Sequence, residues 1–169
     1  MRRNAPIKGG SAVSWWLVFA VIGIAPACVG PLAAGSVQHG STSRDSLAIV
    51  AVARGIIAAD NAKDLTRVLT YYADRALLLP PNEEPVAGRT AIRPRYERLF
   101  SQFDPAIEGT IDEVVVAREW GYIRGRNRGV LRPIGGGPNR LVNDIHIMVL
   151  SRQAYGPWCI SRLIWHAAF

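Results

Sequence analysis

The sequence predicts an α+β domain in which three N-terminal helices pack on one face of a curved antiparallel sheet. Apolar residues in the first half of the folding region recur at the spacing of amphipathic helices. The second half contains long runs of β-branched and aromatic residues, and short turn clusters separate these runs as they separate adjacent antiparallel strands. The chain has 169 residues, of which 49% are hydrophobic. This suits one domain with its own core and excludes an intrinsically disordered chain.

Residues 1–34 have the pattern of an export signal. A basic start leads into an uncharged stretch whose apolar centre covers residues 13–24, and small-residue exits end at Ala27 and Ala34. A basic start, a short apolar run and a small-residue site are typical of a secretory signal peptide. We therefore expect an exported protein, either periplasmic or secreted.

Two alternatives to cleavage stay open. The apolar segment could remain as an uncleaved membrane anchor, although a span of about 20 residues would have to include Pro26 and Pro31. Cys28 could instead carry a lipid, as does the cysteine that follows the apolar run of a bacterial lipoprotein. In each case the folded part lies outside the cytoplasm, and membrane contact is expected only through the anchor or the lipid.

The basic composition gives weak support to a nucleic-acid partner. The formal net charge is +7, but three of the positive charges belong to the export segment, which contains no acid, so +4 remains without them. Single-stranded nucleic acid is bound by aromatic side chains interleaved with basic ones on an open platform, and no such platform is indicated. Export also removes the usual partners, so no nucleic-acid binding is expected.

Residues 35–43 are small and polar, without periodicity, and indicate a linker before a domain that spans residues 44–169. The helical pattern starts at Arg44, and an acid near its start, Asp45, suits the positive end of a helix dipole. Three helices are expected: from Arg44 to a break at Asp60-Asn61, from Leu65 to Tyr72, and around Thr90–Phe103.

One short strand and four long strands complete the pattern. The short strand covers Ala76–Leu79 and ends at Pro80. The glycines at 135–137 are followed by another strand and not by a helix, so they form a turn and not a phosphate-binding loop. The long strands are expected at residues 107–117, 120–132, 140–152 and 158–167.

Two motifs resemble a known superfamily. The run Tyr72–Pro80 (YADRALLLP) is followed by Val86–Arg93 (VAGRTAIR), and Gly156–Ile160 (GPWCI) precedes the pair Ile164-Trp165 near the end. Together they resemble nuclear transport factor 2-like proteins, and within them the SnoaL-like, ketosteroid-isomerase-like bacterial branch. The resemblance covers roughly residues 44–167. It implies a cone-shaped barrel whose helices and concave sheet enclose a pocket, often in a homodimer.

The isomerase mechanism of that branch does not transfer to this sequence. When the tyrosine-containing motifs are superposed, the position of the catalytic base falls at Leu79-Pro80, and that of the first-helix tyrosine falls near Ile56. The third catalytic position falls at Ile147 or Met148. None of these side chains can accept or donate a proton, so function has to be argued from other residues.

Asp144 and His146 are the candidate catalytic pair. They are two residues apart on an expected strand and therefore share a face, where an aspartate can orient an imidazole for proton transfer. The structural alternative is a hydrogen-bonded pair at a strand end or a dimer contact. The chain's three histidines are too far apart to indicate a metal site, and no cofactor is expected.

Large aromatic side chains are candidates for a pocket lining, because they offer apolar area together with a hydroxyl or an N–H group. Arginines at 124, 126 and 128 alternate along one strand and could capture an anionic group. The alternatives are plain core packing for the aromatics and a solvated face or dimer interface for the arginines. The expected ligand-binding residues are Tyr72, Tyr96, Trp120, Arg126 and Trp165.

These observations predict an exported domain that binds a small, largely apolar ligand in a pocket between helices and sheet, without an identified catalytic centre. One alternative is a cyclase, isomerase or lyase that uses Asp144 and His146 as an acid–base pair. Another is a dimeric interaction module. The exported ligand-binding domain is also expected to be a homodimer.

Overall fold

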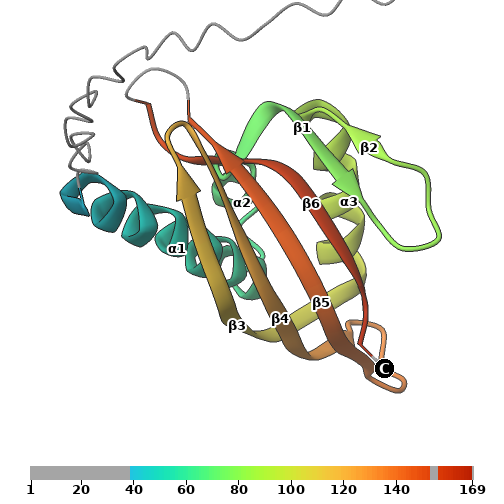
Figure 1. Cartoon of the computed structure of the whole chain (residues 1–169). Coiled ribbons are helices and arrows are strands. Elements are labelled where there is room, and N and C mark those ends of the chain that lie inside the picture. The colour runs from blue at the N-terminus through green and yellow to red at the C-terminus, as the bar shows by residue number, and fades with distance from the viewer. Residues whose placement is uncertain (1–38, 153–155, 169) are drawn as a thin grey trace, which may run out of the picture. The chain divides into compact units, whose positions relative to one another are not determined.

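The computed structural model describes residues 39–152 and 156–168, and it confirms the α+β class. Helices and strands follow each other as expected, with the helices before the long strands (Figure 1). The elements in chain order are α1 (His39–Asn61), α2 (Leu65–Thr70), β1 (Tyr72–Leu79), β2 (Val86–Ala87), α3 (Arg89–Gln102), β3 (Phe103–Ala117), β4 (Trp120–Pro133), β5 (Arg140–Ser151) and β6 (Cys159–Ala167).

The strands form one six-stranded sheet in the order β2-β1-β6-β5-β4-β3. The four long strands pair antiparallel in chain order, as their short turns predict. The first strand differs, because β1 pairs with β6 in parallel and with β2 antiparallel. A parallel pair needs a long connection, and the chain from α3 through β5 supplies it.

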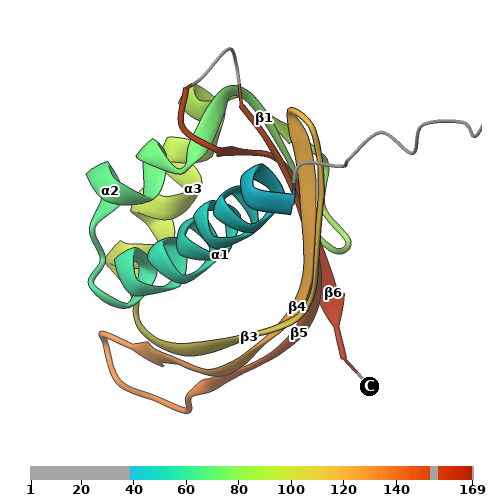
Figure 2. The same cartoon turned by 60° about the vertical axis from the view of Figure 1, so that its left-hand side comes forward.

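The sheet is curved, and all three helices lie on its concave side (Figure 2). The register shifts once between β3 and β4, at Ile111/Glu113, and once between β5 and β6, at Val149/Leu150. Such bulges bend a strand and increase its twist. The long strands therefore wrap around the helices and leave space between the two layers.

The core lies between α1 and the middle of the sheet. Ile49 and Ile56 of α1 are buried against inward residues of the long strands, among them Ile123 and Leu150. The helix can come close to the sheet because β4 has a glycine there. A Cβ on Gly121 would lie 3.2 Å from Cδ1 of Ile49 and 2.8 Å from a backbone oxygen of β3.

Three boundaries differ from the expectation. The helix α1 already begins at His39, before Arg44, and β3 begins at Phe103, directly after α3. Tyr72, expected in a helix, is the first residue of β1, because the chain beside it is fixed by the sheet: the Ile160 N–H donates to the Tyr71 carbonyl oxygen at 2.7 Å. A backbone bond to a distant strand is not visible in a local pattern.

The expected export signal, its two cleavage sites and Cys28 lie outside the described residues. Among the helices that the structure describes, none is both long and apolar enough to span a membrane.

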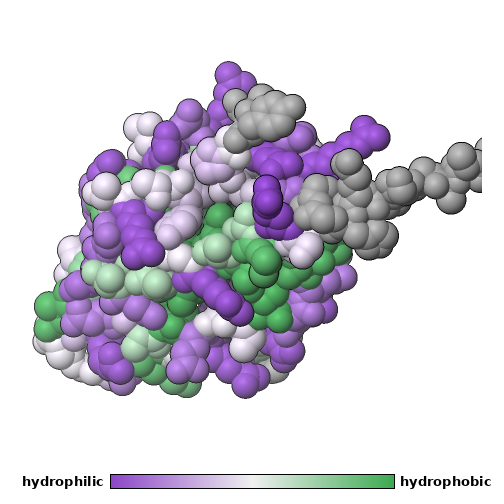
Figure 3. All heavy atoms as spheres, turned by 90° about the vertical axis from the view of Figure 1, so that its left-hand side faces the viewer, coloured by the Kyte–Doolittle hydropathy of each residue, from purple (hydrophilic) through white to green (hydrophobic). Residues whose placement is uncertain are grey.

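Figure 3 views the molecule from the side of α1 and β3, where apolar side chains gather between polar ones. Leu47 of α1 and Val115 of β3 are 69% and 38% exposed. The homodimer stays a prediction.

Candidate functional site

Two adjoining cavities lie between the helices and the concave face of the sheet. The larger has a volume of about 560 Å³ and the smaller about 170 Å³. Helices α1 and α3 supply one wall, and strands β4, β5 and β6 supply the other. The residues that line both cavities are Ile57, Asp60, Tyr96, Asn127, His146 and Leu163.

Three of these shared residues have a buried polar atom without a hydrogen-bond partner. The atoms are Oδ1 of Asp60, Oδ1 of Asn127 and Nδ1 of His146, and the described part of the chain has no other such side-chain atom. Nearly all buried polar groups in proteins are hydrogen-bonded, so each exception calls for an explanation. Here all three exceptions surround the same space, which indicates a site built to meet a ligand.

Asp60 comes from the last turn of α1, and the next residue fixes its position. The Asn61 side chain accepts a hydrogen bond from the backbone N–H of Ile107 at 2.9 Å and donates one to the Ile107 carbonyl oxygen at 2.8 Å. These two bonds attach the end of α1 to β3. Burial without a cationic partner raises the pKa of Asp60 to about 8, so this carboxyl is mainly protonated at pH 7.

His146 comes from β5 on the opposite wall and is 6% exposed. Its cross-strand neighbour on β4 is Gly125, and a Cβ there would lie 3.0 Å from both Cε1 and Nε2 of the imidazole. The glycine therefore makes room for the ring. Burial lowers the pKa of His146, and the more distant Asp112 opposes this only in part, so the imidazole is neutral at pH 7.

Asp144, the expected partner of His146, lies on the same face of β5 and also lines the larger cavity. The two residues are thus brought to one cavity, as the alternation of the strand predicts. Asp144 does not orient the ring through Nδ1, because that atom has no partner. Burial raises the pKa of Asp144, and the charge of His166 opposes this rise.

Two tyrosines form a hydrogen-bonded pair beside the acid. The hydroxyls of Tyr72 and Tyr96 are 2.8 Å apart, and Tyr72 is only 1% exposed, whereas Tyr96 lines both cavities. Burial raises the pKa of both groups, so both stay protonated and can act as donors. With Tyr72 behind it, Tyr96 can present a hydroxyl to a ligand.

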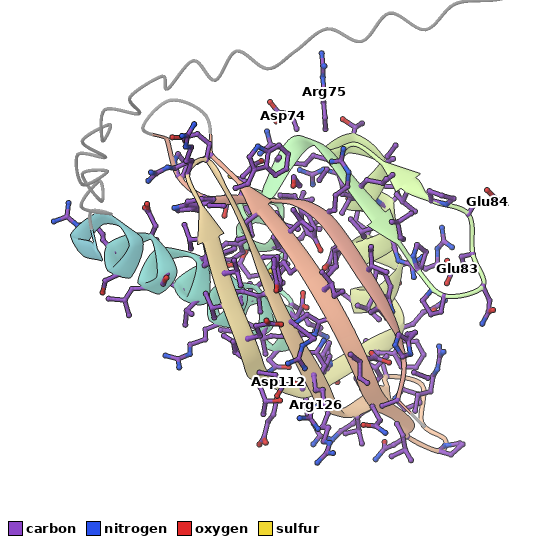
Figure 4. The ribbon with its side chains drawn as sticks, viewed as in Figure 1. Asp74, Arg75, Glu83, Glu84, Asp112 and Arg126 are labelled. Atoms are coloured by element: carbon purple, nitrogen blue, oxygen red, sulfur yellow. The ribbon has the colours of Figure 1, made fainter. Side chains whose placement is uncertain are left out.

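Of the other expected ligand-binding residues, one lines a cavity and two do not. Trp165 lines the larger cavity. Trp120 is 53% exposed at the start of β4, and Arg126 lies on the outer face, where its Nε and Nη2 donate to Asp112 at 3.0 Å each (Figure 4). The alternation of β4 explains this, because its even-numbered residues point outward while Ile123, Gly125 and Asn127 point inward.

Sequence reasoning missed Asp60 and Asn127. Asp60 was interpreted as part of a helix break, and Asn127 as one position between arginines. A signal for Asn127 exists, because it carries the one hydrogen-bonding side chain on the inward face between Gly121 and Gly129 of β4. For metals, the described ranges contain no cluster of three or more His, Cys, Asp or Glu side chains with suitable geometry.

Comparison with known proteins identifies the family. The model of the SnoaL-like domain matches residues 53–152. The chain belongs to the SnoaL-like domain family. This confirms the resemblance that the motifs carry. A comparison with curated proteins finds no match.

Solved structures confirm the fold of this SnoaL-like domain. A ketosteroid isomerase-like protein from Erwinia carotovora atroseptica has a TM-score of 0.66 at 22% identity, with 72% of this chain and 94% of that chain covered. A conserved protein from Planctomyces limnophilus gives 0.68 at 21%, with 72% and 94% covered. A hexachlorocyclohexane dehydrochlorinase from Novosphingobium barchaimii gives 0.66 at 13%, with 75% and 88% covered.

Proposed function

We propose that this SnoaL-like domain is an acid–base enzyme that binds a small, largely apolar molecule and transfers protons on it, as an isomerase or a lyase. His146 is the base and Asp60 is the acid. One observation carries the proposal: the three buried polar side-chain atoms without a partner in the described residues belong to Asp60, Asn127 and His146, which line the same cavities.

The protonation states of the two groups are matched to these roles. The neutral imidazole of His146 can accept a proton from carbon, and the protonated carboxyl of Asp60 can donate one to oxygen or to a leaving group. Two titratable groups whose environments push their pKa values in opposite directions are typical of an acid–base site. Their positions on opposite walls allow a substrate to lie between them.

The proposed step is a balanced proton transfer. His146 removes a proton from a carbon next to an electron-withdrawing group, and the electron pair of that C–H bond forms a new double bond. In an isomerisation Asp60 protonates the carbonyl oxygen as the enol forms; the imidazolium of His146 then gives its proton to a different carbon while the Asp60 carboxylate takes back the enol proton, so both groups return to their starting states. In an elimination Asp60 gives its proton to the group that leaves the neighbouring carbon. After an elimination, solvent returns the proton from His146 to Asp60.

Two further side chains support the developing charge. Tyr96 can donate its hydroxyl proton to a substrate oxygen, with Tyr72 as its hydrogen-bond partner at 2.8 Å. The Asn127 amide lines both cavities and offers a donor and an acceptor. The dehydrochlorinase of the same fold is by its name an eliminating enzyme, which supports this reaction class.

Hydrogen–deuterium exchange on a simple carbon acid tests the proposal. With cyclohexanone in D₂O, NMR should show exchange of the α-protons above the buffer rate. His146→Gln should reduce this rate about 100-fold, the typical contribution of a general base, and Asp60→Asn should reduce it as well. The rate should be highest between the lowered pKa of His146 and the pKa of about 8 of Asp60.

Two matched variants separate the alternatives. His166→Gln changes an exposed histidine of β6 that does not line the cavities, and it should leave the rate unchanged. Asp144→Asn tests the carboxyl that the sequence indicates. A large loss in Asp144→Asn together with none in Asp60→Asn would assign the acid to Asp144. Binding of cyclohexanone without any exchange above buffer would favour a ligand-binding domain and contradict the enzyme.

A further inference from the structure

We propose that the substrate of this site carries a carboxylate, which arginines at the mouth of the larger cavity bind. This inference names the substrate class of the proposed acid–base site and rests on that proposal. The apolar body of the substrate would lie between Asp60 and His146, and its charged end would face the mouth.

Three arginines line the larger cavity, whereas a different one, Arg54, lines the smaller cavity. The three are Arg95 and Arg98 of α3 and Arg140 at the start of β5. Asp60 and His146, on opposite walls, line both cavities. A molecule that lies between Asp60 and His146 and extends into the larger cavity can therefore reach guanidinium groups with its other end.

The protein already places a carboxylate of its own at this mouth. Glu83, on the loop between β1 and β2 (Figure 4), accepts hydrogen bonds from both terminal nitrogens of Arg95, one of them at 3.2 Å. Arg95 first, with a smaller contribution from Arg98, lowers the pKa of Glu83. The Arg95 guanidinium thus accepts a carboxylate in two-pronged geometry, which is the geometry that arginine favours.

This internal pair is easily exchanged. The Glu83 side chain is 55% exposed and that of Arg95 is 33% exposed. Exposed ion pairs contribute little net free energy, because water and salt compete for both partners. A substrate carboxylate can therefore replace Glu83 on Arg95 at small cost, and Glu83 acts as a competitor for the same group.

The other two arginines have no such competitor. Neither Arg98 nor Arg140 forms an ion pair with a carboxylate in the part of the chain that the structure describes. The Arg140 guanidinium lies 5.5 Å from the ring centre of Phe103, a stacked position that leaves its N–H edge free. The lining holds three arginines and three acids, Asp60, Glu83 and Asp144. Because Asp60 is mainly protonated at pH 7, the arginines outnumber the remaining carboxylates.

Binding of two matched probes to the full chain tests the inference. Cyclohexylacetate and cyclohexylacetamide have nearly the same shape, but only the first carries a charge. By calorimetry at low salt, we expect the carboxylate to bind about tenfold more tightly, since one or two charge-assisted hydrogen bonds replace neutral ones. Added salt should reduce this preference, because the mouth is open to solvent.

Variants assign the effect to the named residues. Arg98→Gln and Arg140→Gln should each reduce the preference several-fold, and Glu83→Gln should increase affinity for the carboxylate by freeing Arg95. Arg128→Gln is the control, because Arg128 is exposed on β4 and lines neither cavity. All four residues are on the surface, so circular dichroism should show that the variants fold normally.

Equal binding of the two probes, binding of neither at millimolar concentration, or a preference that survives in Arg98→Gln and Arg140→Gln would each overturn the inference. The readout is affinity and involves no turnover. A failure here therefore leaves the acid–base proposal standing. The exchange measurement on His146→Gln can fail independently of the arginines.

Discussion

At the scale of single residues, the protonation of Asp60 should appear in the stability of the protein. Burial raises its pKa from 3.8 to about 8 in the folded state. Between these values the folded state binds a proton that the unfolded state does not, so the free energy of unfolding falls as the pH rises. The contribution is fully present below about pH 4 and is lost by pH 8. We expect a loss of about 2–4 kcal/mol, less than the full linkage because the cavity admits water.

Urea unfolding at several pH values measures this effect. Asp60→Asn keeps the shape of the side chain and removes its titration, so the wild type should lose stability relative to the variant as the pH rises from 5 to about 8.5. The lowered pKa of His146 acts in the opposite direction near pH 6 in both proteins and cancels in the difference. A difference that does not change with pH would show that Asp60 is ionised in the folded state.

Gly125 is the residue that allows His146 to lie where it does. A Cβ at this position would collide with the backbone oxygen of Thr110 and lie 3.0 Å from two atoms of the imidazole. Gly125→Ala should therefore cost about 2–4 kcal/mol of stability, because the backbone of β3 has to move. Thermal unfolding can measure it. Gly135→Ala, where nothing lies within 4 Å of the added carbon, should change stability by less than about 0.5 kcal/mol.

At the scale of elements, one buried acid attaches the first part of α1 to the far end of the sheet. Asp45 accepts hydrogen bonds from Arg152 Nη1 at 2.7 Å and Nη2 at 3.1 Å, and from Nε1 of Trp158 at 3.2 Å. Arg152 also lies 5.0 Å from the Trp158 ring centre and bonds to Glu119 at 3.2 Å. One carboxylate thus connects α1 with residues from the end of β5, the start of β6 and the turn before β4.

Asp45→Asn should lower the free energy of unfolding by about 2–3 kcal/mol. The asparagine keeps part of the hydrogen bonding but leaves a partly buried guanidinium with Glu119 alone, which is costly. Denaturant unfolding measures this. The matched control is Glu97→Gln, which removes an ion pair of 3.7 Å between half-exposed side chains on α3 and should cost less than about 0.5 kcal/mol. Similar losses in both variants would show that burial of Asp45 adds nothing.

The elements also show how far a sequence can be interpreted by local pattern. Alternation along β4 correctly groups Arg124, Arg126 and Arg128 on one face. It cannot say that this face is the outer one, because that depends on the packing of α1 against Gly121 and on the bulge near Asp112. The expectation that Arg126 binds a ligand depended on the opposite choice.

The site itself shows the same limit. Asp144 and His146 could be paired from sequence because two residues on one strand face are neighbours whatever the fold does. Asp60 could not be assigned to the site from the sequence. Its burial depends on the hydrogen bonds between Asn61 and the backbone of Ile107, which are 46 residues apart. Local spacing identifies the side chains on one strand. It does not identify the residues of another element, here α1, that face this strand across the cavity.

At the scale of the whole molecule, the positive charge has two different environments. On the outer sheet face, Arg124 and Arg126 are paired with Asp112 and Glu113 at 3.0–3.3 Å. The three arginines of the larger cavity share its lining with Glu83, Asp144 and the mainly protonated Asp60. The arginines of the larger cavity are therefore expected to attract an anionic molecule to the site.

At the same scale, the position of the core gives a test of the predicted removal of the export signal. The domain from Val37 onward is one compact unit, and the members of the buried apolar cluster all lie between Ile49 and Ile160. A chain that begins at residue 35, after the second expected cleavage site, should therefore keep the core that the structure describes. We expect it to unfold in one cooperative transition with a Tm within about 2 °C of the full chain, since every buried apolar residue that the structure describes is retained. Calorimetry of both chains measures this. A Tm lower by more than about 5 °C, or a second transition, would show that the N-terminal segment is part of the folded domain and would contradict its removal as a signal.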